Sequence, residues 1–257
     1  MKMLKFPANG GKMVVEDIPA DQMEKAKEMH SALIEAAAEN DEALMDKFFE
    51  EGTLSEDEMI KGLKLGIANR GTFPVICVAA KTDQGVDRMM DLIIKNCPTP
   101  DEGRAMKATN GHEHKYNAAE PFAGFIFKIG IEQHLGEVAF IKVADGELKK
   151  ADDVLNTTTN TKERISQLLA FAGKNRVEVE KAVAGDVVAT IKLKSSPTGT
   201  TLDAKGDDVI EATVYPDPKL RSAVRAVNSA DDEKLGAALN EIRKTDPTFQ
   251  MEQSKEL

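Results

Sequence analysis

The hydrophobic pattern of this chain changes its period near the middle, and that change limits the folds the chain can adopt. Between about residues 20 and 70, apolar side chains recur every three or four positions, which predicts amphipathic helices. The first stripe consists of Met23, Ala26, His30, Leu33, Ile34 and Ala37, and continues with Leu44, Met45, Phe48 and Phe49. From Phe122 onward apolar and polar residues alternate, which predicts strands. The chain therefore combines a helical part with an all-β part.

A second helix is expected to begin at Ser55. Ser55 and Glu58 have the spacing of a capping box, and Leu54 and Met59 have that of a hydrophobic staple.

Residues 73–98 predict a strand, a short loop and a helix. Residues 74–79 are apolar and rich in β-branched side chains, as in a strand covered on both faces. Asp83-Gln84-Gly85 interrupts the run, and an apolar stripe then continues to Cys97, where Pro98 stops the helix. Such a strand needs neighbours for its N–H and C=O groups. The sequence upstream offers no obvious partner strand.

The segment from Pro98 to Glu120 is expected to be a linker or long loop, because it is polar and contains proline and glycine. It includes His112-Glu113-His114, two histidines two positions apart. Further ligands at a recognisable spacing are lacking, so no metal site is predicted there.

The all-β part is expected to be a small closed barrel, since its strands are short and separated by turn residues. Phe125, Phe127, Ile129 and Ile131 should share one face, and Ala139, Ile141 and Val143 should follow before a turn at Asp145-Gly146. Further strands are predicted at 153–157, 164–169, 186–193 and 200–202. The basic residues around the turns are interpreted as solvated surface charges: Lys162, Arg164, Lys174, Arg176, Lys192 and Lys194.

The last region predicts an α+β arrangement. Residues 209–227 alternate as in strands, although Pro216 and Pro218 interrupt them. Residues 231–244 have a helical period that ends at Asp246-Pro247. A strand, a helix and the start of another strand bury too little to form a core, so we expect a domain cut short.

Composition narrows the class of protein. No apolar run approaches the roughly 20 residues of a membrane span, and the N-terminus lacks the apolar core of a signal peptide. We therefore expect a cytoplasmic protein with no membrane partner. The net charge of −10 is concentrated in residues 1–97, with 18 acidic and 12 basic residues, which argues against phosphate contact by that segment. Cys77 and Cys97 are interpreted as reduced packing residues on apolar faces.

Four segments together resemble translation elongation factor G. Residues 16–59 resemble the helical insert of its GTPase domain, and VAAKTDQGVDRMMDLIIKNCPTP resembles the last loop and helix of that domain. Residues 120–189, which include AGDVVA, are similar to its second domain, and residues 231–249, which end in DPTF, are similar to the start of its third.

The resemblance implies a multidomain fold, α/β plus all-β. Its parts are the remnant of a P-loop GTPase domain with a helical insert (1–97), a linker (98–119), a translation-factor β-barrel (120–208) and the truncated start of a ferredoxin-like α+β domain (209–257).

The resemblance also implies part of a ribosomal GTPase that promotes movement of tRNA and mRNA, with GTP and Mg²⁺ as cofactors of the parent and the ribosome, not DNA, as its partner. The phosphate loop G-x-x-x-x-G-K-[ST] is absent from the sequence, so this chain alone is expected neither to bind nor to hydrolyse GTP. No catalytic or metal-ligating residue is predicted. Asp203-Ala-Lys-Gly206 resembles a switch motif but lies after the barrel strands, and is interpreted as a turn.

Ala79, Ala80 and Lys81 correspond, by resemblance, to the last guanine-contact loop of the parent. Ala80 could preserve the backbone N–H that meets the guanine oxygen. Ala79 replaces a serine whose hydroxyl steadies the loop, which makes a divergent second copy of the factor plausible.

Three alternatives stay open. The chain could be a complete, non-catalytic adaptor that binds the ribosome or another protein, or it could be a fragment of a ribosomal protection protein or of release factor three. An independent enzyme has little support, because no serine lies in a nucleophile elbow and the histidines are scattered.

Overall fold

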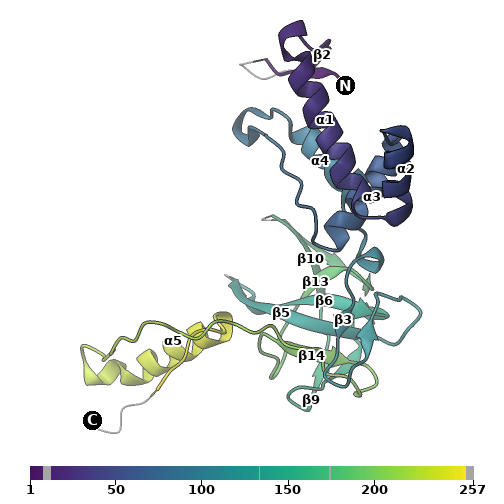
Figure 1. Cartoon of the computed structure of the whole chain (residues 1–257). Helices are drawn as coiled ribbons and strands as arrows, with labels where there is room; N and C mark the ends of the chain where they lie inside the picture. The colour runs from purple at the N-terminus through teal and green to yellow at the C-terminus, as the bar shows by residue number, and fades with distance from the viewer. Residues whose placement is uncertain (8–12, 133, 174, 253–257) are drawn as a thin grey trace. The chain divides into compact units, whose positions relative to one another are not determined.

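The computed structural model describes residues 1–7, 13–132, 134–173 and 175–252. The chain divides into two compact units, Met1–Gly103 and Arg104–Leu257. We call them the helical unit and the β-unit, and each is described by itself (Figure 1).

The helical unit begins with a two-stranded antiparallel sheet, β1 (Met3–Lys5) and β2 (Val14–Glu16). The helices that follow are α1 (Met23–Ala38), α2 (Glu42–Glu51), α3 (Glu56–Ala68) and α4 (Val86–Asn96), with short 3-10 turns at Ala20–Gln22, Ala80–Thr82 and Pro100–Glu102. Ile34, Ala38, Leu44 and Leu54 form the buried core where α1, α2 and α3 meet.

The start of α3 confirms the capping box predicted at Ser55. Ser55 Oγ accepts a hydrogen bond from the Glu58 N–H, and a Glu58 carboxylate oxygen accepts one from the Ser55 N–H at 2.9 Å. Met59 packs against the core that contains Leu54, as the staple requires. The sequence therefore sets where this helix begins.

The strand predicted at residues 74–79 does not form. Phe73 and Val75 are exposed, and within the described residues the segment makes a single bridge, between Ala79 and Gln84. An apolar run becomes a strand only beside another strand that pairs with its N–H and C=O groups, and no described strand pairs with this segment. Cys77 is exposed rather than packed on an apolar face, so that prediction was wrong as well.

Helix α4 has nearly its predicted bounds, and Pro98 follows it. Its apolar stripe is not buried, however, because Met90, Ile93 and Ile94 are all exposed.

The β-unit contains an eight-stranded antiparallel sheet in the order β11-β10-β13-β6-β5-β14-β8-β9. The bounds of its strands are β5 Ala123–Glu132, β6 Gly136–Asp145, β8 Asp153–Asn156, β9 Thr161–Arg164, β10 Leu168–Ala172, β11 Asn175–Val179, β13 Val187–Ile191 and β14 Thr200–Asp203. Two smaller sheets pair β3 (Met106–Lys107) with β4 (Glu113–His114) and β7 (Glu147–Lys149) with β12 (Lys181–Val183).

The main core of the β-unit lies inside this curved sheet. It joins side chains from most of the strands, among them Ile126, Ile141, Leu148, Leu168, Val188 and Leu202. Within the described residues the end strands β11 and β9 are not paired with each other. The sheet is therefore barrel-like, but hydrogen bonds between the described strands do not close it, so the closed barrel that the sequence predicts is not found.

Two strand predictions require correction. Ala139, Ile141 and Val143 do share the main core, but Phe127 and Ile131 are exposed while Ile126 is buried, because the β5–β6 register shifts between Ile126 and Lys128. Residues 164–169 do not form one strand as predicted. They comprise the end of β9, a connection that contains buried Ile165, and the start of β10. The one-residue irregularity in β5 moves the side chains that follow it to the other face.

The C-terminal region shows helix α5 (Asp232–Thr245), followed by Asp246-Pro247 as predicted. The strands expected at 209–227 are absent from the described residues, where Ile210 forms one bridge, to Ala108. The ferredoxin-like arrangement therefore stays a prediction. No helix among the described residues is long and apolar enough to cross a membrane.

Candidate functional site

A side-chain cluster lies where the β3–β4 hairpin meets the segment that follows β14. In the hairpin, Met106 pairs with His114. The segment from Pro98 to Glu120, expected to be a linker or long loop, therefore contributes a hairpin to the β-unit. Thr109 donates from its N–H to the Val209 carbonyl at 2.8 Å, and Glu211 donates to the Lys107 carbonyl at 2.8 Å. These bonds hold Asp208 beside the two histidines of the hairpin.

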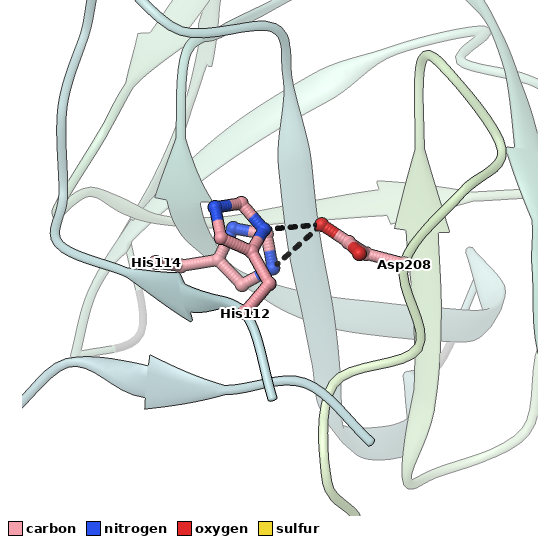
Figure 2. A group of neighbouring side chains, drawn as sticks. All are labelled: His112, His114 and Asp208. Atoms are coloured by element: carbon pink, nitrogen blue, oxygen red, sulfur yellow. Dashed lines mark hydrogen bonds and ion pairs between the residues drawn. The ribbon is translucent and has the colours of Figure 1, made fainter. Parts of the chain in front are cut away.

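The cluster consists of His112, His114 and Asp208, whose ligand-type atoms all lie within 4.8 Å of one another. Figure 2 shows both imidazole rings directed at the Asp208 carboxylate. His112 Nδ1 lies 2.6 Å from Asp208 Oδ2, and His114 Nε2 lies 3.5 Å from the same oxygen. The fold therefore places a third ligand-type side chain beside the two histidines, at a sequence separation that no local spacing reveals.

A second carboxylate holds the buried histidine. His114 Nδ1 lies 2.7 Å from Asp145 Oδ2, and Asp145 Oδ1 accepts the Asn117 N–H at 2.7 Å. Both His114 and Asp145 are almost completely buried. Since a carboxylate oxygen accepts, Nδ1 is the ring nitrogen that carries the proton of this contact, and in that tautomer Nε2 keeps a lone pair.

The third member is fixed by its own contacts. Asn110 Nδ2 donates to Asp208 Oδ1 at 2.6 Å, and Thr157 Oγ1 donates to the Asp208 carbonyl at 2.6 Å. Burial raises the pKa of Asp208, but the hydrogen bonds from His112 and Asn110 outweigh it, so the pKa is below the ordinary value. The same Asp208 contact raises the pKa of His112.

The cluster opens into a pocket of about 250 Å³ with an acidic lining. Its charged and ionisable residues are His112, His114, Glu120, Asp145, Asp203, Lys205, Asp207 and Asp208. Carboxylates outnumber the single lysine, and such a concave acidic surface favours a cation over an anion.

Asp203 is part of the turn that places Asp208. Its carboxylate accepts hydrogen bonds from the N–H groups of Lys205, Asp207 and Asp208 at 2.8 to 3.1 Å. Asp203-Ala-Lys-Gly206 is therefore a turn, as the sequence indicated.

The predicted guanine-contact loop lies in the other unit. Ala79, Ala80 and Lys81 are exposed, and residues 80–82 form a 3-10 turn closed by the hydrogen bond from the Thr82 N–H to the Ala79 carbonyl. Gln84 Nε2 donates to the Pro7 carbonyl at 2.7 Å. The structure therefore forms a compact turn here, and the guanine contact of these three residues stays a prediction.

One comparison bears on the β-unit and another on nearly the whole chain. Residues 121–205 match the family model described as elongation factor G domain 2. A crystal structure of the protein ttk003000868 from Thermus thermophilus is similar to 99% of this chain with a TM-score of 0.78, at 22% identity, and this chain covers 36% of it. At that identity the likeness shows the fold alone.

All eight strands of the main sheet lie within the residues that match this model of a translation-factor domain. More particularly, residues 121–205 are similar to domain 2 of elongation factor G, and the resemblance drawn from the sequence is confirmed there. The chain spans about a third of the length of the structure it matches.

Sequence reasoning found the two histidines but missed Asp208 and Asp145. Asp208 lies 96 residues from His112 and Asp145 lies 31 from His114, so no local spacing connects them. The only available indication was the run of aspartates around Asp207-Asp208.

Proposed function

We propose that this chain is part of an elongation-factor-G-like translation factor, which works on the ribosome in tRNA–mRNA translocation, and that the β-unit contributes ribosome contact. The match of residues 121–205 to elongation factor G domain 2 carries this proposal. The likeness of fold over 99% of the chain supports it, since the helical unit is included. The cytoplasm is the compartment that follows from this role.

The proposed contact is electrostatic on the side of the β-unit. Lys162 in β9 and Lys194 after β13 are exposed, as solvated surface charges are. We propose, beyond that interpretation, that they also neutralise phosphates of the ribosomal RNA backbone. Glu163, the residue after Lys162 in β9, accepts from the Lys194 N–H through its buried carboxylate, which joins the backbone at Lys194 to β9. The backbone positions that carry the two lysines are therefore linked by this hydrogen bond.

Ribosome binding of the full chain tests this proposal. We expect the chain to sediment with ribosomes, and elongation factor G bound to a non-hydrolysable GTP analogue to displace it. The double variant Lys162→Glu and Lys194→Glu should bind roughly tenfold more weakly. A matched control, Lys25→Glu with Lys27→Glu, makes the same charge change on exposed α1 positions. Binding that elongation factor G does not displace would favour the adaptor instead.

In this proposal GTP and Mg²⁺ belong to a longer protein. The absence of a G-x-x-x-x-G-K-[ST] loop from the sequence supports the view that the chain alone neither binds nor hydrolyses GTP. Calorimetry with GTP and with GDP should show no heat of binding. Micromolar affinity for either nucleotide would contradict this view. If such affinity is found, its loss in Ala80→Pro, which lacks the backbone N–H of residue 80, would place the contact at Ala79–Lys81.

A further inference from the structure

We propose that His112, His114 and Asp208 bind a divalent transition-metal ion, with Zn²⁺ as the best match. The proposal rests on the cluster itself and is independent of the role in translation.

The first argument is the orientation of lone pairs. His114 Nε2 is buried and makes no hydrogen bond within the described residues. It faces Asp208 Oδ2 at 3.5 Å, a distance that permits an ion pair but is too long for a good hydrogen bond. With the ring proton on Nδ1, two acceptor atoms face each other, and a positive charge between them removes the repulsion.

The second argument is the number of atoms that converge on that position. Asp208 Oδ2 faces a nitrogen of each histidine, at 2.6 and 3.5 Å. Only the contact with His112 has the length of a good hydrogen bond, whereas a metal ion can bind all three atoms. Two imidazoles and a carboxylate are ligands that Zn²⁺ takes in proteins.

The third argument is geometric. Zn²⁺ binds nitrogen and oxygen at about 2.0–2.2 Å, so the ligand atoms of a tetrahedral site lie about 3.4 Å apart. The distance from His114 Nε2 to Asp208 Oδ2 already fits. His112 would have to withdraw by less than about 1 Å, and its side chain is 54% exposed and has room to move.

The buried partner of His114 matches the usual surroundings of such a ligand. A metal-binding histidine generally donates its other ring N–H to a carboxylate, which fixes the tautomer and the ring. Asp145 occupies that position at 2.7 Å from Nδ1, and it is held in turn by the Asn117 N–H. The carboxylates of the pocket add a negative potential that favours a divalent cation.

The experiment uses the full, untagged chain after removal of metals with a chelator. Calorimetry with Zn²⁺ should give one equivalent, and Co²⁺ should produce the visible absorption bands of a low-symmetry, four-coordinate site. Zn²⁺ should also raise Tm, because it links the β3–β4 hairpin to the segment after β14.

The variants avoid the buried ligand, whose loss could unfold the unit. His112→Ala removes a half-exposed side chain and Asp208→Asn is nearly isosteric; each should weaken Zn²⁺ binding at least tenfold. Asp145→Asn should weaken it ten- to hundredfold through the orientation of His114. His30→Ala is the matched histidine control, and Cys77→Ser with Cys97→Ser controls for thiol binding; both should bind as the wild type does.

Three results would overturn the proposal. They are no binding of Zn²⁺ or Co²⁺ by the folded wild type, unchanged affinity in the combined His112→Ala and Asp208→Asn variant, and loss of binding in the cysteine control. Nitrogen NMR of His114 gives an independent readout: a proton on both ring nitrogens that persists with excess Zn²⁺ would also overturn it.

Discussion

Glu163 accepts a hydrogen bond from Ser196 through a carboxylate oxygen at 2.8 Å, although the two residues are 33 positions apart. The same carboxylate accepts from the N–H groups of Lys194 and Ser195 at 2.8 to 3.1 Å. Glu163 is 2% exposed. One buried side chain therefore organises the connection between β13 and β14.

We expect Glu163→Gln to destabilise that connection by about 1–3 kcal/mol, because the amide places a donor against backbone donors. Hydrogen exchange of peptides spanning residues 161–203 measures the effect. Glu180→Gln, at an exposed position, is the matched control and should change little. Equal exchange in wild type and Glu163→Gln would show that the carboxylate is replaceable.

Gly62 lies where α3 crosses α1. A Cβ at this position would lie 2.2 Å from the Ala37 carbonyl oxygen, so Gly62→Ala has to push the two helices apart. We expect a loss of about 1–3 kcal/mol. Gly236 in α5 has no described atom beyond its own helix within 4 Å, so Gly236→Ala should stabilise by about 0.5–1 kcal/mol. Thermal melts followed at 222 nm measure the stability of both variants. A change of the same sign in Gly62→Ala and Gly236→Ala would contradict the prediction.

Gly146 occupies the corner between β6 and β7, directly after Asp145. Its φ is +70° and that of Gly136 is +75°, so alanine is strained by a similar amount, about 1–2 kcal/mol, at both. Only at Gly146 would the Cβ also meet backbone, at 2.5 Å from the Glu120 carbonyl oxygen. We therefore expect Gly146→Ala to lower Tm more than Gly136→Ala. Similar melting temperatures for the two variants would mean that the backbone at Glu120 can shift away from the added Cβ at little cost.

The helical unit should lose stability in acid through Glu58. Hydrogen bonds from Lys47, and then those from Ser55, lower the pKa of Glu58 to about 2 from an ordinary value of 4.5. Since the folded value is the lower one, the stabilisation is present above pH 4.5 and is lost as the pH falls toward 2. Glu58→Gln lacks this contribution and should show a smaller loss over that window. Circular dichroism of the wild type and of Glu58→Gln from pH 6 to pH 2 measures how much stability each protein loses. The same loss in both proteins would contradict the contribution of the Glu58 carboxylate.

Elements defined by neighbouring residues could be predicted from the sequence. Ser55 and Glu58 specify the start of α3, and Pro98 specifies the end of α4, because capping and proline act over one turn. The alternation through Ala139, Ile141 and Val143 likewise placed β6 against the main core.

Features that depend on distant residues could not be predicted in this way. Residues 74–79 have the composition of a strand but no described partner, and composition cannot supply one. The bulge after Ile126 exposes Phe127 through pairing with β6, which the sequence of β5 does not reveal. The site depends most on distance in the chain, because His112 and His114 acquire Asp208 and Asp145 only when the fold is complete.

Strand β14 has a consequence for how the β-unit matures during synthesis. It is the last strand of the main sheet to be made, yet it lies between β5 and β8, where Thr200 pairs with Ile126 and Leu202 with Asn156. Within the described residues the β8–β9 hairpin joins the sheet only through β14. Pairing over such long sequence separations slows folding. In the nascent domain, one edge of β5 and the β8–β9 hairpin therefore stay unpaired until residues 200–203 leave the exit tunnel. During this period the exposed strand edges are most prone to aggregation, and a chaperone that covers them protects the chain.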